Sequence, residues 1–272
     1  MCDTSNEAGI STVVDRKRTG TGELQFERRT HLISAVEILD VTLGNPNPRL
    51  SEVNLKIASG EYFGLIGMNG AGKTSLIKCI LDFCRPEQGE ISIFGQPAHK
   101  VAARAPIAYL PERFQAAAHL RGEQFLRRMM QLYQVPYHQD DALELFDCLS
   151  LTPTALTLPL GKHSKGMAQK IGLIACLLSG RHLLILDEPM SGLDPYARVK
   201  LKTLLQARRH ANTPSPTLVL SSHMLVDVET LCDRIAILHQ GQLQFIGSPA
   251  ECLQHFAADS LESAYMNCIT GT

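Results

Sequence analysis

Gly67-Met68-Asn69-Gly70-Ala71-Gly72-Lys73-Thr74 fits the pattern G-x-x-x-x-G-K-[ST]. The apolar run at residues 62–66 before it predicts a strand that is buried on both faces, and a helix is predicted from Lys73 to about Phe83. A strand, a loop and a helix in this order are the context that the pattern requires. Glycines let backbone N–H groups turn toward phosphate oxygens, and a helix N-terminus attracts an anion, so the stretch predicts a phosphate-binding loop.

Within this loop, two side chains have roles that follow from their chemistry. Lys73 supplies a point charge for the outer phosphates, and the Thr74 hydroxyl is suited to ligate Mg²⁺. The residues that we expect to bind the nucleotide here are Gly67, Met68, Asn69, Gly70, Ala71, Gly72, Lys73, Thr74 and Ser75. The alternative interpretation is a glycine-rich turn that holds no ligand.

A second motif follows later in the chain, where residues 183–186 form an apolar run that ends in Asp187 and Glu188. In an open α/β sheet, ligands collect at the carboxyl ends of the strands. We expect Asp187 to hold the Mg²⁺ shell through water. Glu188 is placed to accept a proton from an attacking water or to orient it. Without the phosphate loop this signal is weak, because strands that reach solvent often end in charge.

The pattern around these motifs indicates an α/β fold. Residues 53–57 alternate with period two, which is typical of a half-exposed strand. Further strands are expected at 35–41, 90–94, 183–186, 217–220 and 234–238, with helices from 165, over about 195–210 and after 220. Alternating helices and apolar strands predict a parallel sheet that is covered on both faces. Residues 112–160 show helical spacing instead.

Composition narrows the class of protein. The chain has 272 residues, 26 Lys and Arg against 27 Asp and Glu, and 44% hydrophobic residues, which excludes a mostly disordered chain. The balanced charge argues against a general nucleic-acid binder. No apolar run is long enough for a membrane helix, and the N-terminus does not resemble a signal peptide, so we expect a cytosolic protein. The eight cysteines show no zinc spacing and are expected to be reduced thiols.

Four further segments occur in the order found in ATP-binding cassette (ABC) proteins. Residues 163–167 resemble the signature, 191–194 the D-loop and 222–223 the switch histidine, while 109–112 fall where the family has its Q-loop. The resemblance implies a P-loop NTPase with a RecA-like parallel core, an antiparallel β subdomain and a helical subdomain. It also implies an ATPase domain (35–250, helical subdomain about 113–165) and a C-terminal tail helix (251–272), while residues 1–34 are expected to be a flexible tail because they are polar and charged.

Within the family, the chain resembles ATPase subunits of the multidrug and antibiotic-resistance exporter type. The similarity lies in residues 164–167, 221–234 and 260–265. It implies a subunit that binds and hydrolyses ATP with Mg²⁺ and powers transport, in the export direction, through a separate membrane subunit. The implied partners are an integral membrane permease and a second cassette, identical or different, with no nucleic acid. The implied location is the cytoplasmic face of the membrane.

The resemblance also implies roles for single residues. Ser164 and Gly166 would reach the γ-phosphate that is bound on the opposite cassette, with Lys165 between them also counted as nucleotide-binding, and Asp194 would connect the two sites. His223 would hydrogen-bond the γ-phosphate or the attacking water, as a catalytic residue together with Lys73 and Glu188. The alternatives that remain open are helix N-caps for Ser164 and Asp194 and a structural role for His223.

Three positions depart from the family pattern. Glu112 stands where Gln is common and is expected to offer an oxygen to Mg²⁺, with an exposed surface residue as the alternative. Lys165 replaces a signature glycine and adds a cation near the partner's phosphates. Leu43 stands where the family has an aromatic residue that stacks on adenine, which puts recognition of the base in doubt.

Two other functions are compatible with the same motifs. One is a soluble ABC ATPase that acts on nucleic acid or the ribosome, although the segment from Lys73 to Ser164 leaves no room for a long coiled coil and the chain has a single cassette. The other is a regulatory cassette that binds nucleotide without turnover, which the presence of Glu188 and His223 argues against.

Overall fold

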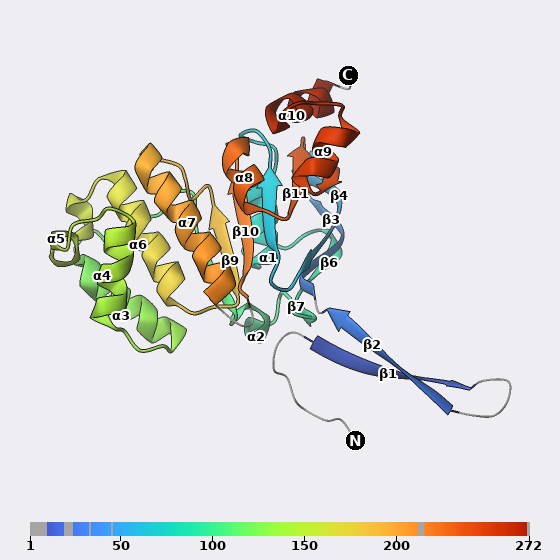
Figure 1. Ribbon diagram of the computed structural model, residues 1–272, viewed down its shortest axis with the longest axis horizontal. Helices are drawn as coiled ribbons and strands as arrows, with labels where there is room; N and C mark the ends of the chain where they lie inside the picture. The colour runs from blue at the N-terminus through green and yellow to red at the C-terminus, as the bar shows by residue number, and fades with distance from the viewer. Residues whose placement is uncertain (1–9, 19–23, 33, 45, 212–214, 271–272) are drawn as a thin grey trace.

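The computed structural model describes residues 10–18, 24–32, 34–44, 46–211 and 215–270. Its main sheet has six strands in the order β12-β11-β5-β10-β9-β8 (Figure 1). These strands are β5 (Tyr62–Ile66), β8 (Ile107–Leu110), β9 (Leu183–Asp187), β10 (Thr217–Ser222), β11 (Arg234–His239) and β12 (Gln242–Gly247). Neighbouring strands are parallel except β11 and β12. The expected parallel core is therefore confirmed, with one antiparallel strand at its edge.

A second sheet is antiparallel and has the order β4-β3-β6-β7. Its strands are β3 (Ser34–Leu43), β4 (Leu50–Ala58), β6 (Gln88–Ile93) and β7 (Gln96–Pro97). In β4, Val53, Leu55 and Ile57 are buried while Asn54 and Lys56 are exposed, so the predicted period-two strand is confirmed.

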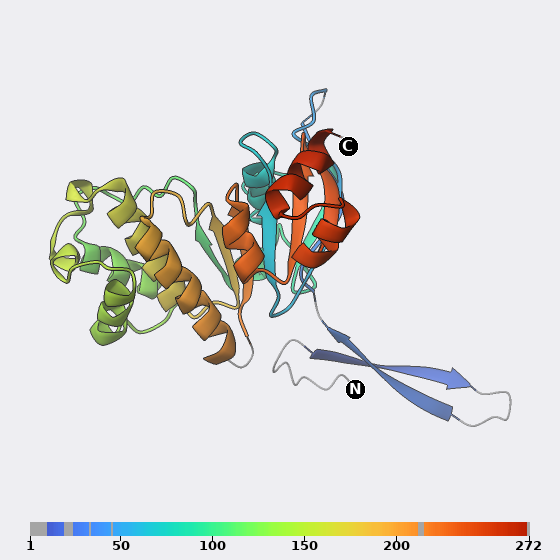
Figure 2. The same cartoon turned by 45° about the horizontal axis from the view of Figure 1, so that its top comes forward.

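Ten α-helices and one 3-10 helix complete the described part of the chain. They are α1 (Lys73–Ile80), α2 (Val101–Arg104), α3 (Gly122–Tyr133), α4 (Gln139–Cys148), α5 (Thr154–Thr157), η1 (Leu160–Lys162), α6 (Lys165–Leu178), α7 (Pro195–Ala211), α8 (Leu225–Leu231), α9 (Pro249–His255) and α10 (Leu261–Thr270). Figure 2 shows α3 to α6 gathered at one end of the molecule, and α9 and α10 near the antiparallel sheet. The stretch expected to be helical thus contains α3, α4, α5 and η1.

Alternate side chains of the parallel strands face two separate apolar layers. Tyr62 and Ile66 pack with residues of the helices α3 to α8. Phe63 and Leu65 lie in the other layer, with α1 and the antiparallel sheet. A strand with both faces covered in this way leaves only its ends accessible, which is why β5 is buried along its whole length.

Three expectations about helices and strands were wrong. The helix after the loop stops at Ile80 instead of about Phe83, because Asp82 has φ +58° and leaves the helical region. The C-terminal segment holds α9 and α10 instead of one tail helix. Residues expected to form a polar tail include an antiparallel hairpin, β1 (Ile10–Arg18) and β2 (Leu24–Leu32), which extends away from the rest of the chain in Figure 1.

Two further sequence-based expectations concern membrane-spanning helices and the state of the cysteines. No helix among the described residues is both long enough and apolar enough to span a membrane. The seven described cysteines are free thiols, as expected; Cys2 lies outside the described residues. The pKa of Cys176 is raised to about 12 because the thiol is fully buried.

Candidate nucleotide-binding and hydrolysis site

The loop of residues 67–74 joins the carboxyl end of β5 to the first turn of α1. Gly70 has φ +85° and Gly72 has φ +113°, a conformation that side chains with a Cβ atom rarely adopt. A Cβ atom at Gly67 would lie 2.5 Å from the carbonyl oxygen of Leu238. The glycines are therefore required by the path of the backbone, whether or not a ligand is bound.

This loop forms one wall of a pocket of about 440 Å³. The pocket is lined by Arg49, Met68, Asn69, Gly70, Gly72, Lys73, Thr74, Ser75, Glu112, Arg113 and Glu188. Most of the predicted nucleotide-binding loop residues line it; Gly67 and Ala71 do not, and Ala71 is buried. Glu112 also lines this pocket, so the structure places it near the loop.

Lys73 lies across the loop instead of pointing into solvent. Its Nζ donates a hydrogen bond to the Gly67 carbonyl oxygen at 2.6 Å and lies 3.4 Å from the Met68 carbonyl oxygen. The same ammonium lies 3.2 Å from Oε1 of Glu188, and only 6% and 8% of the two side chains are exposed. A cation is thus held at the floor of the pocket by two carbonyl oxygens and a carboxylate.

Asp187 lies beside the loop at the carboxyl end of β9. The Thr74 hydroxyl donates to its Oδ2 at 3.0 Å, and the Ser221 hydroxyl donates to its Oδ1 at 2.5 Å. Ser221 belongs to β10, the parallel neighbour of β9, so the sheet itself sets this contact. Asp187 is fully buried, and these hydrogen bonds satisfy a carboxylate that burial would otherwise disfavour.

Glu188 is the most constrained of the predicted catalytic residues. Its φ is +51°, and its N–H lies 2.9 Å from the Ser221 hydroxyl oxygen. Its Oε2 lies 2.8 Å from the His223 ring Nδ1. Among the described residues no hydrogen bond reaches the buried Oε1, although Lys73 lies nearby. This oxygen is ion-paired with Lys73 and is, within the described part of the chain, an acceptor without a hydrogen bond.

The oxygens of Thr74, Asp187 and Glu112 fit a hard divalent cation. Hydroxyl and carboxylate oxygens are the ligands that Mg²⁺ prefers, and the ion keeps several waters, so a site need not be a closed protein cage. The described residues contain no group of three His, Cys, Asp or Glu side chains that would hold a metal by themselves. The donor set suits a cation that is shared with a phosphate ligand.

The sequence profile of the ABC transporter family matches residues 50–191, which include the loop, Glu112, Asp187 and Glu188. The chain belongs to the ABC transporter family. An ABC transporter ATP-binding protein of Nostoc is 37% identical over 75% of this chain and 61% of its own length. The bacitracin transport ATP-binding protein of Bacillus licheniformis is 32% identical over 71% of this chain and 63% of its own length. The chain therefore spans about three fifths of these relatives.

Solved structures of ABC cassettes have the same fold. An ATP-binding subunit of an ABC transporter matches with a TM-score of 0.77 and 29% identity, over 87% of this chain and 100% of that chain. A dimeric bacterial ABC transporter cassette matches with a TM-score of 0.70 and 19% identity, over 78% and 98%. The predicted P-loop NTPase fold is confirmed by these matches.

The residues that resemble the ABC signature lie apart from the phosphate loop of the same chain. Ser164, Lys165 and Gly166 do not line the pocket of Lys73, and Ser164 and Lys165 are exposed. The Ser164 hydroxyl oxygen accepts the Met167 N–H at 3.2 Å and caps α6, so the N-cap interpretation is confirmed. The same exposure leaves Ser164 accessible to a second chain.

Asp194 likewise caps a helix. Its Oδ1 accepts the Ala197 N–H at 2.9 Å, directly before α7, which begins with Pro195. This hydrogen bond, helped by the nearby Lys170, lowers the pKa of the Asp194 carboxyl group. The N-cap interpretation is confirmed, and the proposed connection between two cassettes stays a prediction.

Two residues near the loop, Arg49 and Tyr265, were missed from the sequence. Arg49 lines the pocket, whereas Leu43 is only 3% exposed and belongs to the apolar core. Tyr265 of α10 accepts a hydrogen bond from the Met68 N–H. Nothing in the local pattern indicates either contact, since both depend on segments that meet only in the folded chain.

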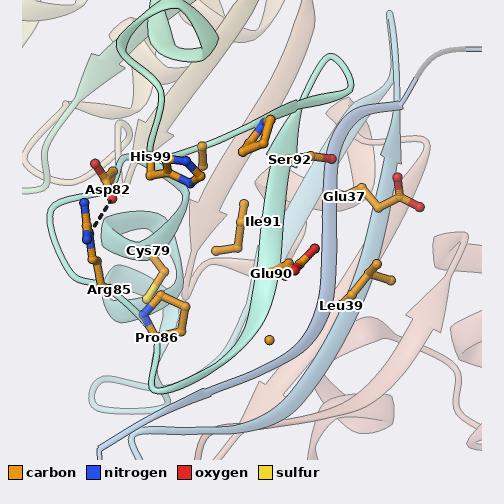
Figure 3. Close-up of a pocket in the computed structure, with 13 residues that line it drawn as sticks. Glu37, Leu39, Cys79, Asp82, Arg85, Pro86, Glu90, Ile91, Ser92 and His99 are labelled. Carbon is orange, nitrogen blue, oxygen red and sulfur yellow. Dashed lines mark ion pairs between the residues drawn. The ribbon is translucent and has the colours of Figure 1, made fainter.

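A second pocket, of about 420 Å³, lies between the end of α1 and the strands β3 and β6 (Figure 3). Glu37, Glu90 and His99 are among its lining residues, and Arg85 forms an ion pair with Asp82 on one side. None of the predicted site residues lines it. The pocket is therefore separate from the phosphate loop.

Proposed function

We propose that this chain is the ATP-binding and ATP-hydrolysing subunit of an ABC transporter and powers export through a separate membrane subunit. The observation that carries the proposal is the continuous contact from Lys73 through Glu188 to His223 at the phosphate loop. It places a cation for the phosphates against a carboxylate oxygen that accepts no hydrogen bond from the described residues. A glycine-rich turn without a ligand would have no need of this arrangement.

The chemistry follows from the positions of these side chains. Lys73 and the loop N–H groups hold the β- and γ-phosphates of ATP. A water oxygen bonds to the γ-phosphorus, and the bond from that phosphorus to the bridging oxygen of ADP breaks. Oε1 of Glu188 accepts the proton of the water or orients it. His223 holds the other carboxylate oxygen and so fixes the direction of Oε1.

Thr74, Asp187 and Glu112 would hold Mg²⁺, with Asp187 acting through water. When bound, this ion neutralises charge on the phosphates. The hydrogen bond between Thr74 and Asp187 keeps the two oxygens close together, which supports their assignment to one ion.

The proposed partners are a second ABC cassette and an integral membrane permease, at the cytoplasmic face of the membrane. The exposed Ser164 and Lys165, with Gly166, would contact the nucleotide on the opposite cassette, and Asp194 would connect the two sites. The relative that is named for bacitracin transport supports a transport function. The resemblance of residues 164–167 and 260–265 to exporter subunits supports the direction.

Glu188→Gln tests the hydrolytic role. We expect ATP hydrolysis to fall by about 100-fold or more, since a general base contributes that much, while the Kd for ATP stays within about twofold. Glu144→Gln, an exposed change in α4, is the matched control and should leave both unchanged. Hydrolysis that survives Glu188→Gln would overturn the assignment of the base and favour another catalytic group.

The transport role is tested with the same variant. Tagged Glu188→Gln protein is purified in mild detergent with ATP, and the proteins that co-purify are identified. A polytopic membrane protein is the expected partner. Recovery in the soluble fraction with ribosomes or DNA would instead favour the soluble ABC ATPase.

A further inference from the structure

A hydrogen bond joins the C-terminal helix to the phosphate loop. The Met68 N–H donates to the Tyr265 hydroxyl oxygen at 3.1 Å, although the two residues are far apart in the sequence. Tyr265 lies on α10 and is only 7% exposed. Its hydroxyl therefore reaches the loop from within the packed structure and not from a mobile surface position.

The contact acts on a peptide group that Lys73 also touches. The carbonyl of Gly67 and the N–H of Met68 belong to one planar peptide unit and point in opposite directions. Tyr265 accepts the N–H, and the carbonyl oxygen accepts Lys73 Nζ at 2.6 Å. One rigid plane is thus held by a C-terminal tyrosine on one side and by the nucleotide-binding lysine on the other.

The position of the hydroxyl is fixed by how α10 is docked. Leu261 and Ala264, on the same helical face as Tyr265, are 2% and 0% exposed. The Ser260 hydroxyl oxygen accepts the Ser263 N–H at 3.2 Å at the start of the helix. The Asn267 side chain donates to the Phe256 carbonyl oxygen, which ties α10 to the end of α9.

We propose that Tyr265 is a positioning residue that sets the Gly67–Met68 peptide for Lys73 and so links the docking of α10 to ATP affinity. The hydrogen bond to the N–H strengthens the carbonyl on the same peptide as an acceptor, because linked hydrogen bonds polarise one another. The ammonium is then held over the loop before ATP arrives. This inference rests on the proposed function, since it concerns the affinity of the same site.

Tyr265→Phe removes only the hydroxyl and keeps the ring in the core. We expect the Kd and KM for ATP to rise about fivefold, the effect of one hydrogen bond, with kcat and the Tm nearly unchanged. Binding is measured by titration with a fluorescent ATP analogue, and KM by steady-state hydrolysis. Tyr137→Phe is the matched control, because no hydrogen bond reaches its buried hydroxyl among the described residues.

Two outcomes would overturn the inference. If Tyr265→Phe lowers the Tm but leaves Kd and KM unchanged, the hydroxyl only anchors α10. If Tyr265→Phe still raises Kd in a Met68→Pro background, where the N–H is already absent, the effect does not pass through this hydrogen bond. Wild-type protein that binds no ATP would instead refute the proposed function, so the two failures are distinguishable.

Discussion

At the scale of single residues, adenine has no aromatic ring at residue 43 to stack on, and we expect Arg49 to take that role. Leu43 is buried and offers no ring, while Arg49 lines the phosphate pocket. A guanidinium plane stacks on a base, which an ammonium does not. We expect Arg49→Ala and Arg49→Lys each to weaken ATP binding about fivefold, in line with such stacking.

Tripolyphosphate separates this role from a phosphate contact. Its Kd should stay within about twofold in Arg49→Lys if the guanidinium acts on the base. Arg85→Ala, at the second pocket, is a control that should not alter either ligand. An equal loss of ATP and tripolyphosphate affinity would show that Arg49 binds phosphate instead.

The sequence predicted the site residues that sit next to a motif. Lys73, Thr74, Asp187, Glu188 and His223 were predicted because each lies at the end of a buried strand or at the start of a helix, and the structure brings them together at the loop. Contacts between distant segments carry no such local pattern. The sequence therefore gave no indication of the hydrogen bond to the loop from α10, more than 190 residues away.

At the scale of elements, β5 and α8 pack closely because Gly64 of β5 has no side chain. A Cβ atom at Gly64 would lie 2.3 Å from Cγ1 of Val228 and 3.2 Å from Sγ of Cys232. Gly64→Ala must push the helix off the sheet, so we expect a loss of about 1–3 kcal/mol in unfolding free energy.

Urea unfolding of Gly64→Ala and wild type measures this loss. Gln244→Ala, on the exposed face of β12, is the control and should change stability by less than about 0.5 kcal/mol. Equal stability of Gly64→Ala and wild type would mean that α8 moves without cost.

The start of α9 gives a pH prediction. Ser248 and Glu251 exchange hydrogen bonds as a capping box, and the bond from the Ser248 N–H lowers the pKa of the Glu251 carboxyl group below its usual 4.5. A lowered pKa in the folded state means that the carboxylate adds stability above pH 4.5, which is lost as the pH falls through the lowered pKa.

Glu251→Gln keeps an oxygen for the cap but cannot titrate. We therefore expect wild type to have the higher Tm at pH 7, and the difference to close in acid. Calorimetry from pH 7 to pH 3 measures it. A difference that stays constant across this range would exclude the carboxylate as its source.

The positions of helices and strands were predicted well for short apolar runs, such as β9 and β10, and poorly at the two ends of the chain. The strands at 183–186 and 217–220 extend only to Asp187 and Ser222. The C-terminal break was missed because it depends on Ala257, whose φ is +47°. The N-terminal hairpin was missed because its residues are largely polar, and polarity does not determine strand pairing.

At the scale of the whole molecule, the separation of the signature from the loop predicts a shared site. In the proposed head-to-tail dimer, the loop of one chain would meet Ser164 of the other. Lys73→Ala and Ser164→Arg should each abolish hydrolysis alone. Mixed together, they should recover about a quarter of the wild-type rate, because half of the dimers carry one intact site of two.

Co-expression of the two variants followed by an ATPase assay makes this measurement. As a control, a chain that carries both Lys73→Ala and Ser164→Arg is paired with Lys73→Ala. This pair should be inactive, because neither chain supplies Lys73. If the mixture of single variants stays inactive while both chains dimerise, the site is not shared in the way that the exposed signature suggests.

The contact between Lys73 and Glu188 couples ATP binding to the release of the catalytic carboxylate. Before ATP arrives, the carboxylate that would drive hydrolysis is occupied by the cation that must hold the phosphates. We expect an arriving phosphate oxygen to compete for that cation and so to release the carboxylate. Binding of ATP would thereby free the base that hydrolyses it, and a cassette without ATP would have no free base.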